Sequence, residues 1–230
     1  MAVFAGPEIV NDGLVLHLDA ANPRSYPGSG TVWTDLSGNG NNGTLVNGVG
    51  YNSANNGSMI FDGANDYVST NFNPNLDNRL YTYEAWFKDN SPGGFTDNTT
   101  IISSYGFTAT TPHSQFHIFN DGTIRILERN SAGTLSFVKG STNICDGSWK
   151  QLVATASSTE LRLYINGVLI GSAVRPGGVI TSGQNFILGS GHLDRYQSCS
   201  FSNFKIYMDK ALSQQEVRQN FEATRSRYGI

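Results

Sequence analysis

Charged side chains are scarce in this chain of 230 residues, and no cluster of basic residues occurs in it. Asp, Glu, Lys and Arg make up 14% of the residues, against about 25% in an ordinary globular protein. The 15 Lys and Arg stand against 18 Asp and Glu, which gives a formal net charge of −3. Nucleic-acid binding needs Lys and Arg facing phosphates, so we expect no nucleic-acid partner.

Long hydrophobic runs are also missing. No apolar stretch reaches the roughly 18–20 residues that a membrane-spanning helix needs, so no membrane association is expected. Residues 1–10 contain no basic residue and no apolar stretch of signal-peptide length. We therefore expect no secretion signal.

Cysteine is limited to Cys145 and Cys199, which cannot make a disulfide framework. Both lie in segments that resemble strands. We interpret them as two buried free thiols that pack as small apolar groups, with a single long-range disulfide as the alternative.

The usual signatures of nucleophilic and zinc chemistry are absent. The sequence has no Gly-x-Ser-x-Gly elbow and no His-Glu-x-x-His motif. His113 and His117 are four residues apart in a segment that reads as a strand. That spacing puts them on one face but about 13 Å apart, too far to share a metal ion.

Turn dipeptides and alternating apolar residues recur along the whole chain. Period-two alternation at 14–18, 81–88, 161–165 and 204–208 predicts half-buried strands. Two hairpins are predicted, at 160–173 with a turn at Asn166-Gly167 and at 115–128 with a turn at 120–122. Trp33, Trp86 and Trp149 fall inside strand patterns and are expected in the core.

One helix is predicted, at 214–225. Ser213 and Glu216 form a capping-box pattern, and Leu212 can pack on Val217 as a hydrophobic staple. We expect Val217 and Phe221 to face the sheet.

Several segments, in their order along the chain, resemble a laminin-G-like, concanavalin-A-like jelly roll. They are Gly13 to Ala20, Trp33 to Gly43, Phe61 to Val68, Tyr83 to Phe87, Trp149 to Ala154, Leu163 to Gly167 and Phe204 to Tyr207. The resemblance implies an all-β fold: a two-sheet antiparallel jelly-roll sandwich with one short C-terminal helix. We expect an N-terminal arm at 1–12, the jelly roll at 13–212, and a helix and tail at 213–230 that pack on the same domain.

The short lead-in and the tail at 227–230 resemble virion structural proteins of tailed phages, including those of cyanobacterial and marine phages. This resemblance implies a non-enzymatic virion component, made in the host cytoplasm, that decorates a capsid or joins a tail. Its expected partners are other virion proteins, with host-surface glycans and further copies of the chain also open. The alternative is a free-standing carbohydrate-binding lectin module.

Glucanases of this fold carry paired carboxylates at alternating positions of one strand, because glycoside hydrolysis needs two carboxyl groups flanking one bond. None of the six glutamates here has a second carboxylate two residues away. We therefore expect no enzyme activity.

Two loop-like stretches supply candidate glycan-binding residues, because aromatic rings can face the C–H side of a sugar while polar groups read its hydroxyls. The candidates are Tyr105, His113, His192, Arg195 and Tyr196. The alternative is that they simply complete loops.

A cofactor is not expected, although calcium is a candidate. Asp62, Asn65 and Asp66 surround Gly63 and offer the hard oxygen ligands that calcium prefers. The alternative is a tight turn in which Asp and Asn bond their own backbone.

The two ends of the chain are candidates for docking. Arg218, Arg225 and Arg227 lie near an apolar tip at 228–230, so we expect this basic surface and the N-terminal arm to meet a partner. A solvated basic face and a frayed end are the alternative.

Overall fold

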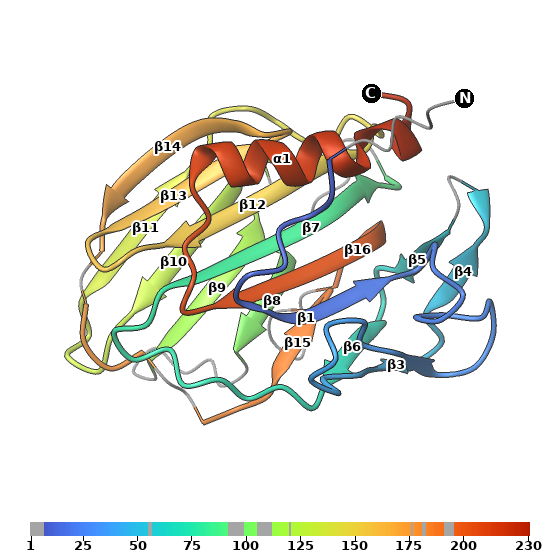
Figure 1. Cartoon of the computed structure of the whole chain (residues 1–230), viewed down its shortest axis with the longest axis horizontal. Coiled ribbons are helices and arrows are strands. Elements are labelled where there is room, and N and C mark those ends of the chain that lie inside the picture. The colour runs from blue at the N-terminus through green and yellow to red at the C-terminus, as the bar shows by residue number, and fades with distance from the viewer. Residues whose placement is uncertain are drawn as a thin grey trace.

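The computed structural model describes residues 7–54, 57–91, 99–104, 112–119, 121–175, 177–180, 183–190 and 196–230. Two eight-stranded antiparallel sheets pack against each other (Figure 1). This arrangement confirms the predicted all-β sandwich with one C-terminal helix.

Sheet A has the order β14-β13-β12-β7-β16-β5-β4, with β1 paired to β16. Its strands are β1 (Leu14–Asp19), β4 (Gly50–Asn52), β5 (Ser58–Asp62), β7 (Tyr81–Asp89), β12 (Lys150–Ala156), β13 (Glu160–Ile165), β14 (Val168–Val174) and β16 (Ser198–Met208). Sheet B has the order β11-β10-β9-β8-β15-β6-β3-β2. Its strands are β2 (Val32–Trp33), β3 (Gly43–Val46), β6 (Tyr67–Thr70), β8 (Thr99–Ser104), β9 (His113–Ile118), β10 (Ile124–Arg129), β11 (Leu135–Lys139) and β15 (Phe186–Leu188).

Both predicted hairpins are present. β13 and β14 pair around Asn166 and Gly167, whose φ angles are 50° and 77°. Positive φ at both central residues is what the tightest hairpin turns require, and Asn-Gly tolerates it. β9 and β10 pair in full register from Ile118↔Ile124 to His113↔Arg129.

The main core lies between the sheets, where the inward side chains of both meet. Trp33, Trp86 and Trp149 are all buried, as predicted, but only Trp33 belongs to this main core.

Cys145 and Cys199 are buried and unbonded to each other, and burial raises the pKa of both thiols. The prediction of two free thiols is confirmed.

The helix α1 (Gln214–Thr224) lies along the outer face of sheet A (Figure 1). Its capping box between Ser213 and Glu216 is formed as predicted. Val217 packs with Leu212 and with side chains of β12, β13 and β16. The helix ends one residue before the predicted limit, and a 3₁₀ turn (Arg225–Tyr228) follows it. No helix among the described residues is long and apolar enough to cross a membrane.

A buried polar network fixes α1 and the N-terminal arm to sheet A. Glu84 and Lys205 are fully buried and 2.9 Å apart. Asn220 on α1 donates to Glu84 Oε2 at 2.7 Å, and its Oδ1 accepts from the backbone N–H of Val10 at 2.8 Å. The amide of one helical residue thus links the arm, the helix and the central strand β7.

The pairing of the three C-terminal arginines corrects the expected docking surface at Arg227 only, and docking through the exposed Arg218 or through the N-terminal arm stays a prediction. Arg227 binds Asp19 through two contacts of 2.8 and 3.0 Å, whereas Arg218 and Arg225 both pair with Glu222. An Arg that already holds a buried carboxylate in a two-point contact is not available to a partner. Sequence alone missed this because Asp19 is distant in the chain.

Candidate functional site

The outer face of sheet B is crossed by one row of directly paired residues. Direct partners on antiparallel strands point to the same side of a sheet, and the alternate residues of these strands, such as Phe116 and Val138, face the core. The row contains Thr44, Ser69, Ile187, Ser103, Gln115, Leu127 and Phe137. Its middle is buried and its two ends are exposed. Two separate accessible areas therefore lie on this face.

The first area is a hollow of about 300 Å³ over β6 and β15. We refer to this feature as the hollow. Its lining consists of Ser69, Gly183, Gln184, Asn185 and Ile187. Ser69 and Ile187 come from paired positions of the two strands, and the other three come from the segment that leads into β15. The lining combines hydroxyl and amide groups with one branched apolar side chain and carries no charge.

The second area is the β9–β11 face, the outer side of the three strands at the edge of sheet B. Cross-strand pairing arranges its side chains in three rows of three. The rows are Lys139–Arg125–His117, Phe137–Leu127–Gln115 and Leu135–Arg129–His113. An apolar and amide row thus lies between two rows that carry cations and histidines.

Aromatic rings hold the cations of the first row. The Arg125 guanidinium lies 4.3 Å from the ring centre of Phe119 and 5.5 Å from that of Phe137. Lys139 Nζ lies 4.3 Å from the same Phe119 ring. Arg125 Nε donates to His117 Nε2 at 2.8 Å, so that nitrogen of His117 acts as an acceptor. These contacts fix the direction of two long flexible cations.

One carboxylate lies beside this group. Asp121, in the turn between β9 and β10, is 2.7 Å from Lys139 Nζ. The bond from Lys139, together with those from the Thr123 side chain and backbone, lowers the pKa of Asp121 to about 2. Asp121 is therefore ionised throughout the neutral range.

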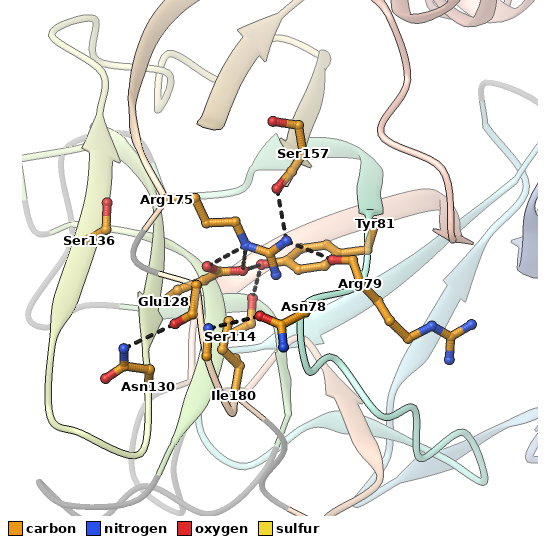
Figure 2. A network of polar contacts seen from close by, with 12 residues as sticks. Asn78, Arg79, Tyr81, Ser114, Glu128, Asn130, Ser136, Ser157, Arg175 and Ile180 are labelled. Atoms are coloured by element: carbon orange, nitrogen blue, oxygen red, sulfur yellow. Dashed lines mark hydrogen bonds and ion pairs between the residues drawn. The ribbon is translucent and has the colours of Figure 1, made fainter. Parts of the chain in front are cut away.

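A buried ion pair inside the sandwich anchors the segment that leads to the hollow. Figure 2 shows the Arg175 guanidinium between the carboxylate of Glu128 and the carbonyl oxygens of Arg79 and Ser157. Arg175 Nε lies 2.8 Å from Glu128 Oε2, and both side chains are buried. Tyr81 donates its hydroxyl to the same carboxylate. This cluster ties β7, β10 and the end of β14 together.

Three further bonds continue from this ion pair toward β15. Asn130 Nδ2 donates to the carbonyl of Gly177 at 3.0 Å, and Asn78 Oδ1 accepts from the backbone N–H of Gly178 at 3.0 Å. The backbone N–H of Ile180 donates to Asp77 Oδ1 at 2.7 Å. The described segment just before the hollow is therefore held by fixed partners.

Two of the predicted glycan residues, His113 and Tyr196, lie in the described part of the chain, on different elements. His113 is the first residue of β9, is buried, and pairs with Arg129. Tyr196 is half-buried and bridges to Ser190, which follows β15. Ser190 lies beside β8, where the Ser103 hydroxyl donates to its carbonyl oxygen at 3.4 Å, and a glycan-binding role for these residues stays a prediction. Tyr105, His192 and Arg195 lie outside the described residues.

The proposed calcium residues form a turn between β5 and β6. Asp62 Oδ1 accepts from the backbone N–H of Ala64 at 2.7 Å and of Asn65 at 3.4 Å. Asp66 is buried, and its Oδ2 accepts from the backbone N–H of Asp62 at 3.0 Å. Burial raises the pKa of Asp66. Within the described residues no group of three or more His, Cys, Asp or Glu is placed to hold a metal ion, and calcium binding here stays a prediction.

The two buried glutamates each serve a structural ion pair. Glu84 is enclosed by Lys205, Gln151 and Asn220, and Glu128 by Arg175 and Tyr81. Sheet A separates the two side chains. Glu84 lies on the outer side of this sheet, toward α1, whereas Glu128 faces the core between the two sheets. Neither geometry pairs two carboxylates across one bond.

Neither the hollow nor the β9–β11 face was predicted from the sequence. A signal for the second was present, because Arg125, Leu127 and Arg129 alternate beside a hairpin turn. That alternation says which side chains share a face, but the row is completed by β11, whose register the sequence does not reveal.

Solved structures with this fold include three binding domains of toxins. The binding domain of Paraclostridial Mosquitocidal Protein 1 has a TM-score of 0.74 and 19% identity over 92% of this chain and 52% of its own. The botulinum neurotoxin serotype D binding domain has 0.73 and 18% over 93% and 51%. A serotype D ligand-binding domain in complex with N-acetylneuraminic acid has 0.71 and 18% over 93% and 51%. This chain spans about half the length of each, and the likeness shows the fold.

No curated protein matches the sequence. A family model described as the concanavalin A-like lectin/glucanases superfamily matches residues 62–218. The match begins at the end of β5 and ends inside α1, so it covers more than half of the chain and most of both sheets. The resemblance to a laminin-G-like, concanavalin-A-like jelly roll is thereby confirmed, and the chain belongs to the concanavalin A-like lectin/glucanase superfamily.

Proposed function

We propose that this chain is a lectin-like carbohydrate-binding module and that the hollow is its sugar site. The observation that carries the proposal is the neutral, polar lining of the hollow on an otherwise well-packed sheet. Its volume of about 300 Å³ is at the lower end of the range for small-molecule sites. A small uncharged ligand rich in hydroxyl groups fits this chemistry.

The lining groups suit a sugar in two ways. The hydroxyl of Ser69 and the amides of Gln184 and Asn185 can each donate and accept hydrogen bonds, as sugar hydroxyls also do. Ile187 offers an apolar surface to the C–H side of a ring. Gln184 and Asn185 are exposed, so a ligand reaches them from solvent.

The comparisons support binding rather than hydrolysis. The superfamily contains lectins and glucanases, and this sequence lacks the alternating carboxylates on one strand with which glucanases of this fold supply the two carboxyl groups for hydrolysis. The solved structures named above are binding domains, one of them in complex with N-acetylneuraminic acid. Since this chain covers about half of that protein, its sugar does not identify the ligand here.

A glycan array followed by titration calorimetry tests the proposal. We expect the wild-type chain to bind one class of glycans, and Gln184→Ala and Asn185→Ala each to lower the affinity by roughly three- to tenfold, the value of one or two hydrogen bonds. Gln215→Ala on α1 is the matched control, because Gln215 is also exposed and lies on the other side of the sandwich.

Two results would reject the hollow as a sugar site. One is the absence of binding to any neutral or sialylated glycan on the array. The other is equal binding by the Gln184→Ala, Asn185→Ala and Gln215→Ala variants. Release of reducing sugar from laminarin, a glucan substrate, would show instead that the chain is a hydrolase.

A virion role stays a separate prediction. None of the proteins compared above is a virion component, and the basic residues expected to dock pair within the chain. Detection of the chain by mass spectrometry of purified phage particles is the observation that would support that role.

A further inference from the structure

One lysine, one glutamate and one asparagine meet in the buried layer between sheet A and α1. Lys205 on β16 pairs in register with Glu84 on β7, and both side chains are fully buried. Asn220 of α1 is fully buried as well. Replacing a buried ion pair by hydrophobic residues is often neutral or stabilising. Stability alone therefore does not account for these three side chains.

The carboxylate of Glu84 bridges the other two side chains, with one oxygen on each. Its Oε1 accepts from Lys205 Nζ at 2.9 Å, and its Oε2 accepts from Asn220 Nδ2 at 2.7 Å. An amine and an amide held on the two oxygens of one carboxylate are close neighbours. The same carboxylate can take a proton from the lysine and give one to the amide nitrogen.

The amide of Asn220 is held in a fixed orientation by further bonds. Its Oδ1 accepts from the backbone N–H of Val10 at 2.8 Å, and its Nδ2 also donates to the Tyr207 hydroxyl at 2.9 Å. Tyr207 in turn donates to the carbonyl oxygen of Val10 at 3.0 Å. A fixed N–H on the amide oxygen stabilises the negative charge that forms there when a nucleophile adds to the carbon.

We propose that Lys205 and Asn220 form an intramolecular isopeptide bond, with Glu84 moving the protons. Glu84 takes a proton from the lysine ammonium, which leaves a neutral amine as the nucleophile. Nζ attacks Cγ of Asn220, and Glu84 passes one proton from Nζ to Nδ2. The Cγ–Nδ2 bond breaks and ammonia leaves. The product is a secondary amide between Nζ and Cγ, and Glu84 ends protonated.

This reaction removes two buried charges. The Glu84–Lys205 ion pair described above is its starting state. The product holds a neutral amide and a neutral carboxylic acid, which cost less to bury than two ions. Because the fold holds the amine and the amide side by side, no second molecule has to be brought to the site. The bond would join α1 to β16 covalently.

A second asparagine touches the lysine and differs in one respect. Asn203, two residues before Lys205 on β16, accepts from Lys205 Nζ through its Oδ1 at 2.8 Å. Among the bonds of the described residues, its Nδ2 pairs with His17 Nε2 at 3.2 Å rather than with Glu84. Glu84 is therefore placed to protonate the nitrogen of Asn220, which makes Asn220 the reacting amide and Asn203 the natural control.

Mass spectrometry of the full purified chain tests the bond. We expect an intact mass lower than that of the sequence by one molecule of ammonia. After unfolding and digestion with trypsin, residues 196–210 should stay joined to residues 219–225, because trypsin does not cleave after a lysine whose Nζ is in an amide. The tandem spectrum of this branched peptide would place the bond at Lys205 and Asn220.

Three variants separate the roles of the side chains. Lys205→Met and Glu84→Gln should both keep the full mass of their sequences and lack the branched peptide. Asn203→Ser is the matched control: it removes the other amide that touches Lys205 and should lose ammonia like the wild type. Circular dichroism checks that each variant is folded. The wild-type spectra decide the proposal even where a variant fails to fold.

Four outcomes overturn the proposal. One is a wild-type chain that keeps the full mass of its sequence after prolonged incubation at neutral pH. Another is loss of ammonia without a branched peptide, as from cyclisation of an Asn-Gly pair such as Asn166-Gly167. The third is a bridge from Lys205 to Asn203, which would leave residues 219–225 as a free peptide. The fourth is a branched peptide in folded Glu84→Gln, which would remove Glu84 from the reaction.

Discussion

Loss of either partner of the Glu128–Arg175 pair should strongly destabilise the fold. Both side chains are almost fully buried, and their charges are satisfied by each other, by Tyr81 and by two backbone carbonyls. A buried pair adds little net stability over a hydrophobic replacement, but removal of one partner leaves an uncompensated charge. A substitution at either residue therefore tests how much this buried pair matters for the stability of the fold.

We predict that Glu128→Gln lowers the free energy of unfolding by about 3–5 kcal/mol. The neutral amide leaves the Arg175 charge buried without a counter-charge. Urea unfolding measures the change, with Glu160→Gln as the control, because Glu160 forms an exposed pair with Arg162 and should have little effect. Similar losses in the two variants would contradict this account.

His17 gives the fold a pH dependence at the level of one residue. Burial, followed by the nearby charge of Lys205, lowers the pKa of His17 to about 4, although Asp19, Glu84 and Asp35 act to raise it. In the unfolded chain the pKa is about 6.5. Between these values the unfolded state binds more protons, so stability falls as pH drops from about 6.5 to about 4.

The predicted loss over that range is up to about 3 kcal/mol. Unfolding measured in urea at several pH values between 4 and 7 should show it, and His17→Gln should have a flatter profile. An equal slope in the variant would assign the pH dependence to other groups.

At the scale of elements, the 3₁₀ turn after α1 works as a cover for two tryptophans. The ring of Tyr228 stacks on Trp86 with centroids 3.9 Å apart and lies 5.0 Å from the ring centre of Trp149. All three are buried, with Phe221 packed against them. The tail that sequence alone offers as a docking tip is thus part of a small second core.

We predict that Tyr228→Ala lowers the free energy of unfolding by about 2–4 kcal/mol. Trp86 and Trp149 would gain water contact, so the tryptophan emission should shift to the red. Tyr228→Phe keeps the ring and should change neither quantity much. An unshifted spectrum in Tyr228→Ala would show that the turn does not shield these rings.

The elements themselves were largely predictable, because their signals are local. Asn166-Gly167 sets a hairpin turn and Ser213 with Glu216 sets a helix start, whatever surrounds them. The burial of Glu84 and Lys205 was not predictable in this way. Alternation marks them as the second face of a strand, and only the packing of α1 removes that face from water.

The sites were less predictable than the fold. Tyr105, His113, His192, Arg195 and Tyr196 were chosen because they are clustered along the chain. The two described members lie on different elements, since His113 begins β9 and Tyr196 bridges to Ser190 after β15. The hollow and the β9–β11 face join residues from separate strands, so their composition depends on register, which sequence alone does not provide.

At the scale of the whole molecule, the described surface of sheet B offers two areas of different electrostatic character. The hollow has a neutral lining, and the β9–β11 face gathers three cations in a chain of net charge −3. Screening by salt weakens contacts between exposed charges, since the Debye length falls from about 30 Å at 0.01 M to about 8 Å at 0.15 M. It hardly affects hydrogen bonds between neutral groups.

We therefore predict that glycan binding in the hollow does not depend on salt. Between ~0.01 M and ~0.15 M salt, the affinity for a neutral glycan should stay the same in the wild type and in Lys139→Gln, whereas Asn185→Ala should weaken binding at both concentrations. Calorimetry at both salt concentrations measures this. A fall in wild-type affinity with salt that Lys139→Gln abolishes would mean that the ligand binds on the β9–β11 face instead of in the hollow.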